Sequence, residues 1–210
     1  MVCYIAGAGE FSKRALPSGD DYVIAADAGY LALSDNGIAP DLVVGDFDSL
    51  GFMPKHPEVV CCPSEKDDTD LLIAVREGLA RGHRSFVING ALGGRLDHTL
   101  ANIQILKMLA QNGAYGVLVG HEVCVTALKN GTLGFAPGAS GTISVFALGD
   151  KAEGVTLTGL KYGLVDAVLT DFYPIGTSNE FMGEAATITV KSGTLAIIWT
   201  GEPGELDWEK

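Results

Sequence analysis

The sequence predicts an α/β N-terminal domain with a mainly parallel sheet, followed by a C-terminal all-β sandwich domain. In the first part of the chain, short apolar runs alternate with segments of helical periodicity, which is typical of a parallel sheet covered by helices on both faces. In the last part, apolar runs are separated only by Gly, Ser, Asn and Asp, which is typical of a sandwich or flattened barrel. We expect the boundary at Lys129-Asn130-Gly131. The two domains then cover residues 1–129 and 130–210.

Four short apolar runs and one helical pattern open the chain. The runs are expected to be buried strands, because each contains hardly any polar side chain. They cover residues 2–6, 23–26, 42–45 and 59–62. Between the second and third runs, residues 28–36 form a short predicted helix. It ends at Asn36-Gly37, because this pair favours the left-handed turn that stops a helix.

The clearest helix is predicted over residues 67–81. Apolar residues recur there at three- and four-residue spacing on one face, namely at Leu71, Leu72, Val75 and Leu79. Asp67, Asp68 or Thr69 caps the start of this helix, and Gly82 ends it. A strand over residues 85–89 follows.

A second long helix is predicted over residues 97–111, closed by Asn112-Gly113. Its apolar face consists of Leu100, Ile103, Leu106 or Lys107, and Ala110. The remaining predicted elements are strands, and beyond residue 129 no helix is expected. These strands cover residues 116–119, 123–128, 142–148, 153–158, 164–169, 186–190 and 194–199.

Composition excludes several classes of protein. Apolar residues make up 47% of the 210 residues, which is enough to form a core. The formal net charge is 14 − 26 = −12 and no run of Lys or Arg occurs, so we expect no nucleic-acid partner. The uncharged run over residues 130–149 contains several Gly and a Pro, so we expect no membrane partner. The start lacks the pattern of a signal peptide, and the four cysteines show no CxxC spacing; we expect a reduced, cytoplasmic protein.

Two carboxylates, Asp46 and Asp48, directly follow the predicted strand over residues 42–45. The carboxyl end of a parallel strand is where open α/β sheets bind ligands. Two acids this close repel each other unless a cation lies between them, and oxygen ligands of this kind suit Mg²⁺. Taken alone, the pair is explained equally well as an Asp-rich turn.

A second acidic cluster, which includes Asp67, Asp68 and Asp70, lies at the start of the clearest helix. Capping and the helix dipole explain much of it. Asp70, however, lies in the first turn beside Leu71 and can reach the same site as the carboxylates at residues 46–48. Three converging acids would form a metal site.

A glycine-rich segment over residues 89–98 joins a predicted strand to a helix. Its glycines and the helix start allow backbone N–H groups to approach an anion, and Arg95 adds a fork suited to phosphate oxygens. The alternative is a flexible loop capped by Asp97, and His98 alone is better explained as structural. Asp27-Ala28-Gly29 is a weaker strand-to-helix motif.

Residues 7–9, Gly-Ala-Gly, form a weaker motif still, since they do not complete GxGxxG. The acidic, glycine-rich and Asp-Ala-Gly motifs share one placement: each follows a strand and precedes a helix. A parallel sheet gathers such motifs along one edge, so together they predict a site for a metal and a nucleotide polyphosphate.

Six motifs, in this order and spacing, resemble those of the thiamine pyrophosphokinase family. The first four are Asp-Ala-Gly at 27–29, GDFDS at 45–49, KDDTD at 66–70 and GGRLDHTLAN at 93–102. Two more, GLKY at 159–162 and GTSNE at 176–180, look like the family's thiamine-binding signatures. The resemblance covers essentially the whole chain, and several separate motifs in order make it far more specific than any one of them.

The resemblance implies a homodimer that binds thiamine between its subunits and transfers a pyrophosphoryl group from ATP to the thiamine hydroxyl, releasing AMP. Mg²⁺ is the implied cofactor, held by Asp46, Asp48 and Asp70. These three and Asp97 are the implied catalytic residues, with Asp70 or Asp97 accepting the hydroxyl proton. The implied ligand contacts are Asp27, Gly93, Gly94, Arg95, Asp97 and Asn102 for ATP and its phosphates, and Tyr162, Thr177, Ser178 and Asn179 for thiamine.

Two residues depart from the family pattern. Ala28 stands where many relatives have Gly, which requires only a tolerable backbone angle at that position. Tyr162 stands where some relatives have Trp, and its smaller ring can still stack on a cationic thiazolium or a pyrimidine.

Two other functions are compatible with parts of the pattern. A haloacid-dehalogenase-like phosphatase also uses an Asp-x-Asp motif, but after its first strand, whereas Asp46 follows the third predicted strand. A thiamine or nucleotide carrier would use the same site for binding alone. A purely structural protein is the weakest reading, because it leaves the glycine loop and the acidic pair without a purpose.

Overall fold

The structure, a computed structural model, describes residues 1–48, 50–63, 65, 67–203 and, for the backbone, 206–209. Ser49 and Lys66 of the motifs above therefore lie outside the described residues. The chain forms two compact units. The first contains Met1–Ile105 and Leu118–His121, and the second contains Leu106–Val117 and Glu122–Lys210. The helices are α1 (Gly29–Asp35), α2 (Asp70–Ala80) and α3 (Leu96–Gln111).

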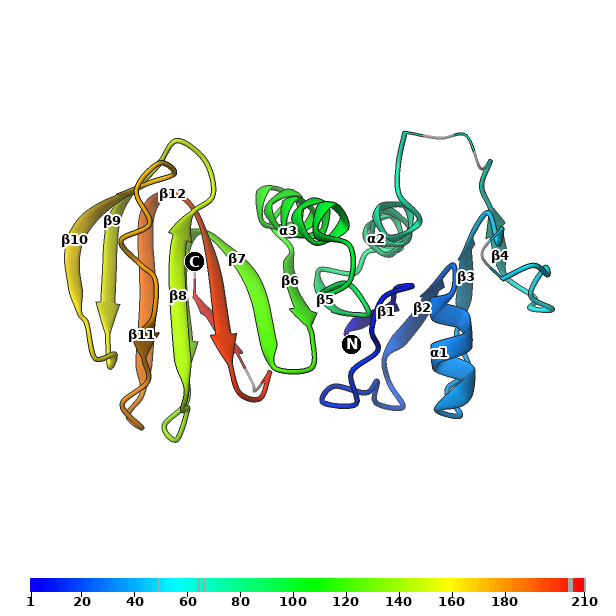
Figure 1. Cartoon of the computed structure of the whole chain (residues 1–210), viewed down its shortest axis with the longest axis horizontal. Coiled ribbons are helices and arrows are strands. Elements are labelled where there is room, and N and C mark those ends of the chain that lie inside the picture. The colour runs from blue at the N-terminus through cyan, green and yellow to red at the C-terminus, as the bar shows by residue number, and fades with distance from the viewer. Residues whose placement is uncertain (49, 64, 66, 204–205, 210) are drawn as a thin grey trace. The chain divides into compact units, whose positions relative to one another are not determined.

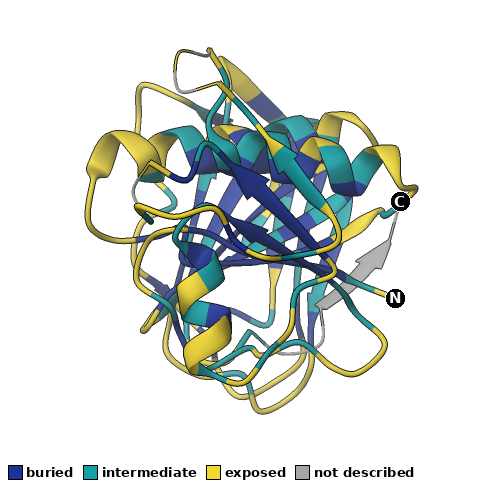
Figure 2. Ribbon diagram, turned by 90° about the vertical axis from the view of Figure 1, so that its right-hand side faces the viewer, coloured by how far each residue is buried: buried dark blue, intermediate teal, exposed yellow. Residues whose placement is uncertain are grey.

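The first unit contains a five-stranded parallel sheet, as the alternating pattern predicts. Its order is β4-β3-β2-β1-β5, and every neighbouring pair runs parallel. All residues of β1 and β3 are buried (Figure 2), because strands with both faces covered have no exposed side. The strands are β1 (Cys3–Ala6), β2 (Tyr22–Ala26), β3 (Leu42–Gly45), β4 (Val59–Cys61) and β5 (Ser85–Asn89).

Helices α1 and α2 cover opposite faces of this sheet (Figure 1). Leu33 of α1 packs in one buried cluster with Tyr4 and Val23. Gly78 of α2 lies against the other face, since a Cβ there would come within 2.9 Å of the Cys3 sulfur. Because Cys3 and Tyr4 are consecutive strand residues, their side chains point to opposite faces.

Helix α2 starts at Asp70 and is capped by Thr69. The Thr69 hydroxyl accepts a hydrogen bond from the backbone N–H of Leu72 at 3.2 Å, which satisfies one of the free donors at a helix start. Of the three candidate caps, Thr69 is therefore the one used. Asp68 instead forms an exposed ion pair with Arg76.

The predicted apolar face of α3 is partly wrong. Leu100 is 58% exposed, whereas Asn102, Ile105, Leu106 and Leu109 are buried. The Asn102 amide donates a hydrogen bond of 2.7 Å to the backbone oxygen of Ala91, outside the helix. This bond gives a polar side chain a buried position and fixes the rotation of the helix, which an apolar periodicity does not reveal.

The second unit contains strands only, apart from the end of α3, and no other helix occurs among its described residues. Neighbouring strands in the order β10-β9-β12-β7 are antiparallel, and β8 also pairs with β12. The strands not yet named are β6 (Tyr115–Val119), β7 (Val123–Phe135), β8 (Thr142–Ala147), β9 (Lys151–Thr158), β10 (Leu164–Thr170), β11 (Asn179–Glu180), β12 (Ala186–Thr200) and β13 (Leu206–Glu209).

Two predicted interruptions in this unit lie inside continuous strands. The expected strands 186–190 and 194–199 are one strand, β12, and the Asn-Gly at the expected domain boundary lies within β7. Asn130 has a φ of 46°, and its side-chain oxygen accepts a hydrogen bond from the Gly193 N–H at 2.9 Å. The register of the two strands shifts at this point. The turn-forming residues therefore make a bulge instead of ending either strand.

The four cysteines are free thiols, with Cys3 and Cys124 buried. Burial raises the pKa of the Cys3 thiol to about 12, so this side chain stays protonated and behaves as a small apolar residue. None of the helices in the described part of the chain is long and apolar enough to cross a membrane.

Helix α1 packs so closely on β1 that its first residue has to be Gly. A Cβ at Gly29 would lie 2.0 Å from the backbone oxygen of Ala6, so we expect Gly29→Ala to lower the free energy of unfolding by about 1–3 kcal/mol or more. Urea denaturation followed by circular dichroism measures this. Gly19→Ala is the control, because no atom lies within 4 Å of a Cβ there. Equal stability of the two variants would contradict the close packing.

Candidate active site

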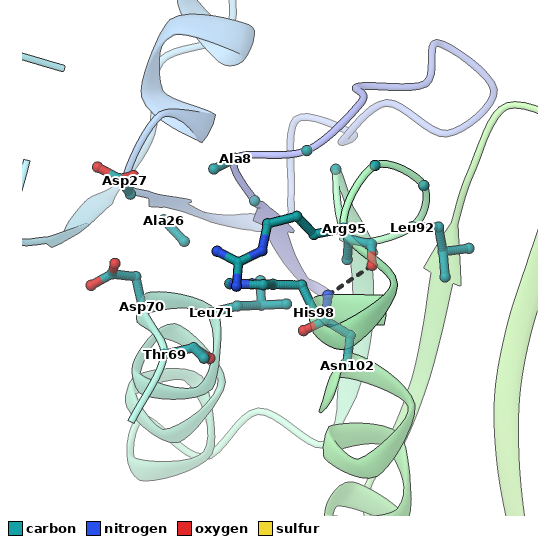
Figure 3. Close-up of a pocket in the computed structure, with 16 residues that line it drawn as sticks. Ala8, Ala26, Asp27, Thr69, Asp70, Leu71, Leu92, Arg95, His98 and Asn102 are labelled. Carbon is teal, nitrogen blue, oxygen red and sulfur yellow. Dashed lines mark hydrogen bonds between the residues drawn. The ribbon is translucent and has the colours of Figure 1, made fainter. Parts of the chain in front are cut away.

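A cavity of about 440 Å³ opens in the first unit, at the carboxyl ends of its parallel strands (Figure 3). This is the edge where open α/β sheets bind ligands. Several motifs that are far apart in the sequence meet at this edge, as their shared position between a strand and a helix predicts. The walls consist of residues 7–9, 26–27, 69–71 and 90–95, with His98 and Asn102.

The glycine loop forms one wall of the cavity with its backbone. Gly90, Gly93 and Gly94 have φ values of 66°, 82° and 62°, a conformation that side chains other than Gly adopt at a cost. The loop leads directly into α3, and the start of a helix is a place where backbone N–H groups favour an anion. The Asn102 side chain of α3 supports the loop through its bond to Ala91.

The Gly-Ala-Gly segment that follows β1 forms a second wall, which sequence reasoning rated too low. The N–H of Gly7 donates to the backbone oxygen of Asn89 at 2.8 Å, and the N–H of Gly9 donates to that of Gly90 at 2.8 Å. Only the pairing of β1 with β5 brings these segments together, so no local motif could reveal it. The cavity is also lined by Thr69, Leu92 and His98. From the sequence, Thr69 is a candidate helix cap and His98 is a structural residue, and no role is predicted for Leu92.

Asp27 and Asp70 place their carboxylates on the same flank of the cavity, while Arg95 and His98 lie across from them (Figure 3). Asp27 follows β2 with a φ of 49°, a strained angle of the kind found at functional sites. Ala28 has φ −61° and ψ −11°, so the Ala that replaces the family's Gly has ordinary helical angles.

Arg95 and Asp97 form a two-point ion pair on the surface. The Arg95 Nε donates to Asp97 Oδ1 at 3.2 Å, and Nη2 donates to Oδ2 at 2.5 Å. The hydrogen bond from Arg95 lowers the pKa of Asp97 to about 2, and the same bond raises the pKa of Arg95. Arg95 lines the cavity, whereas Asp97 is not among the lining residues.

Asp46 and Asp48 lie on the turn after β3, outside the cavity lining. Phe47 between them is buried in the core and has a φ of 62°. The carboxylate of Asp46 accepts a hydrogen bond from the Asp48 N–H at 3.2 Å. The buried Phe47 ring thus anchors the turn, and the hydrogen bond to the Asp46 carboxylate stabilises it.

The expected cluster of Asp46, Asp48 and Asp70 is not formed in this structure. Among the residues that the structure describes, no three His, Cys, Asp or Glu side chains lie close enough together to hold a metal ion.

The expected thiamine residues lie in the second unit, where Asn179 fixes the backbone of Tyr162. The Asn179 Oδ1 accepts from the Tyr162 N–H at 2.9 Å, and its Nδ2 donates to the Tyr162 oxygen at 2.7 Å. Asn179 is 6% exposed, whereas the Tyr162 residue is 59% exposed. The buried amide therefore holds an exposed aromatic ring in place.

The two neighbours of Asn179 in the motif are exposed and held by loop contacts. Thr177 donates its hydroxyl hydrogen to the Pro174 oxygen at 3.0 Å. Ser178 has a φ of 58°, and its N–H donates to the Ser144 hydroxyl at 3.1 Å.

The cavity combines a glycine-rich backbone wall, a cationic fork and carboxylates at one sheet edge, which suits the phosphates of a nucleotide. The first unit therefore places the chain among the α/β phosphotransferases. Comparison with known proteins narrows this class. Residues 14–117 match the family description "Thiamin pyrophosphokinase, catalytic domain", and residues 132–195 match "Thiamin pyrophosphokinase, vitamin B1 binding domain". The chain belongs to the thiamin pyrophosphokinase family.

Individual relatives agree with this assignment. Thiamine pyrophosphokinase of Bacillus subtilis is 30% identical over 189 residues, which cover 83% of this chain and 85% of that protein. A crystal structure of thiamine pyrophosphokinase from Bacillus subtilis superposes with a TM-score of 0.86 at 25% identity, covering 95% of this chain and 99% of the other. The enzyme from Geobacillus thermodenitrificans gives a TM-score of 0.83 at 26% identity, with 97% and 99% covered.

The ion pair on the glycine loop predicts how Asp97 titrates. In Arg95→Gln the main cause of the lowered pKa is removed, so we expect the Asp97 midpoint to rise from about 2 toward its ordinary 3.8. Titration of the carboxyl carbon by NMR measures it. Arg84→Gln, which removes a guanidinium that bonds only backbone oxygens of Leu79 and His83 in the described chain, is expected to leave the midpoint unchanged. A midpoint that stays near 2 in Arg95→Gln would contradict this cause.

Proposed function

We propose that the chain transfers a pyrophosphoryl group from ATP to the hydroxyl of thiamine, giving thiamine diphosphate and AMP. Family membership supports the reaction. The observation that carries the proposal is the cavity in which Asp27, Asp70 and Arg95 face a backbone wall of glycines. Pyrophosphoryl transfer requires positioning of the phosphates and neutralisation of their charge, and these groups supply both.

The ATP phosphates are proposed to lie along Gly93 and Gly94, with the guanidinium of Arg95 on their oxygens. In this structure Arg95 forms an ion pair with Asp97, so a bound phosphate would compete with the Asp97 carboxylate for the Arg95 guanidinium. Asp27 and Asn102 complete the proposed contacts with the nucleotide. The Asn102 amide also donates to the Ala91 oxygen, so this residue keeps the loop in shape as well.

Mg²⁺ is the proposed cofactor, with Asp46, Asp48 and Asp70 as the residues that would hold it. The donors fit the ion, because Mg²⁺ prefers carboxylate oxygens together with substrate phosphates. When bound, the ion would neutralise charge on the phosphates as the β-phosphorus is attacked. These residues lie on the turn after β3 and at the start of α2.

Asp70 is the proposed acceptor of the thiamine hydroxyl proton. Asp97 is the alternative, but its pKa of about 2 makes it a weak base. Asp97 also has its carboxylate engaged by Arg95 and is not among the residues that line the cavity. Asp70 lines the cavity at the start of α2.

Thiamine is proposed to contact Tyr162, Thr177, Ser178 and Asn179, in a C-terminal domain folded as a β-sandwich. The exposed ring of Tyr162 offers a face to the cationic thiazolium. The Lys161 ammonium lies 5.5 Å from the centroid of this ring and forms an ion pair with Glu180 at 2.7 Å. Asn179 contributes by holding the Tyr162 backbone.

A cytoplasmic homodimer is the proposed assembly. Strand β10 lies at one end of the strand order β10-β9-β12-β7, and edges of this kind need a cover. Val165, Val168, Phe172 and Tyr173, on β10 and just after it, are 87%, 56%, 82% and 63% exposed. A group of apolar side chains of this kind is typical of an interaction surface.

The activity is tested with purified protein, ATP, thiamine and Mg²⁺. We expect AMP and thiamine diphosphate in equal amounts, and no AMP when thiamine is omitted. Free phosphate released from a phosphate monoester would instead favour a haloacid-dehalogenase-like phosphatase. Binding of ATP and thiamine with no turnover in Mg²⁺ would favour a carrier.

The metal role is tested by Asp48→Ala. Because the Asp48 side chain is exposed, we expect the variant to fold and to lose at least about 100-fold in kcat, since a bound metal contributes several kcal/mol of charge stabilisation and about 1.4 kcal/mol is tenfold in rate. Asp20→Ala, an exposed acid in a turn of the same unit, is the control and is expected to keep full activity. Near-normal turnover in Asp48→Ala would refute the metal role.

A further inference from the structure

Asn89, at the end of β5, is completely buried and makes five hydrogen bonds with its side chain. Its Oδ1 accepts from the N–H groups of Ser12 and Gly90, both at 2.8 Å. Its Nδ2 donates to the Tyr4 hydroxyl at 2.9 Å and to the backbone oxygens of Ser12 and Ala15 at 2.6 and 3.2 Å. Both lone pairs of the oxygen and both hydrogens of the amide are therefore used.

These bonds connect the two segments that form adjoining walls of the cavity. Ser12 and Ala15 belong to the segment that follows β1, and Gly90 starts the glycine loop. The Tyr4 hydroxyl closes the network by donating to the Ala15 oxygen at 3.0 Å. Burial raises the pKa of Tyr4 to about 12, so the hydroxyl keeps its hydrogen for this bond at neutral pH.

The two walls are in such close contact that neither Gly7 nor Gly90 has room for a side chain. A Cβ at Gly7 would lie 2.7 Å from the Gly90 oxygen, and a Cβ at Gly90 would lie 2.5 Å from the Gly7 oxygen. A small displacement of the segment after β1 therefore changes the shape of the cavity directly. Asn89 does not line the cavity itself, so any effect on a ligand has to pass through these walls.

We propose that Asn89 is a positioning residue for the nucleoside triphosphate: its buried amide holds the segment of residues 7–15 against the glycine loop, so that both backbone walls are preformed for the phosphates. The inference rests on the proposed function of the cavity. It assigns a role in ATP binding to the Gly-Ala-Gly segment after β1, which lines the cavity. Preformed donors lower the ordering cost of binding, so loss of the network is expected to weaken ATP binding more than it affects the chemical step.

The test uses two variants of the network and one matched control. Asn89→Ala removes all five bonds, and Tyr4→Phe removes only the hydroxyl while keeping the ring. Thr126→Val is the control, because it removes a buried hydrogen bond of 2.6 Å to the Gly116 oxygen in the second unit. Steady-state kinetics and the midpoint of thermal unfolding are measured for each variant.

We expect the KM for ATP to rise about tenfold or more in Asn89→Ala and about threefold in Tyr4→Phe. The KM for thiamine and the kcat at saturating ATP are expected to change by less than about twofold. Thr126→Val is expected to lower the thermal midpoint and leave the KM for ATP unchanged. If Asn89→Ala does not fold, Tyr4→Phe decides alone. An unchanged KM for ATP in the network variants, with a lowered midpoint as in the control, would make Asn89 an ordinary core residue and overturn the proposal.

Calorimetric titration with Mg·ATP in the absence of thiamine separates this inference from the proposed reaction. Wild-type protein that binds ATP in this titration but forms no AMP in the separate assay with thiamine contradicts the proposed reaction, and a weaker Kd in Asn89→Ala and Tyr4→Phe then still supports the positioning role. Active wild-type protein with an unchanged Kd in both variants contradicts the positioning role alone. Wild-type protein that neither binds ATP nor forms AMP contradicts both.

Discussion

The parallel pairing of β1 with β5 is the constraint on which the cavity depends. It aligns Ala6 with Asn89, so the chain leaves both strands at the same height and the next residues, Gly7 and Gly90, meet backbone to backbone. Neither position has room for a side chain, because each Cβ would overlap a carbonyl oxygen of the other segment. The resulting walls of backbone groups are rigid and offer polar atoms at close range, which is what a phosphate-binding surface requires.

Charges of both signs lie close together around the cavity of an acidic protein. The net charge is −12, yet Arg95 is placed on the glycine loop, opposite Asp27 and Asp70 (Figure 3). Charges on the distant surface are screened beyond about 10 Å, so the local groups decide what the cavity binds. The ion pair with Asp97 neutralises the charge of the Arg95 guanidinium.

The residue Ala28 has ordinary helical backbone angles. This departure from the family pattern therefore does not disturb the turn that follows Asp27.

Most strands and helices could be predicted, because each depends on a run or a periodicity within a few residues. Prediction failed where a distant contact overrode the local pattern. Asn130 and its Gly form a bulge opposite Gly193 inside β7, where the sequence predicted the end of a strand. The face of α3 is turned by the hydrogen bond from the Asn102 amide to the Ala91 oxygen.

The fold also argues against the haloacid-dehalogenase-like alternative, because Asp46 follows β3 and does not line the cavity.

The sequence by itself determined the order of the elements, the parallel sheet of the first unit and the family. Apolar periodicity, turn residues and motifs each depend on residues that are close together in the chain, so they can be recognised without the structure. It also predicted Asp27, Asp70 and Arg95 as site residues, and the structure places these three around one cavity. Only the tertiary structure decided that the segment after β1 is a cavity wall and that Asn89 holds it. Both depend on hydrogen bonds between residues about 75 or more positions apart, and strand pairing, not local sequence, brings such residues together.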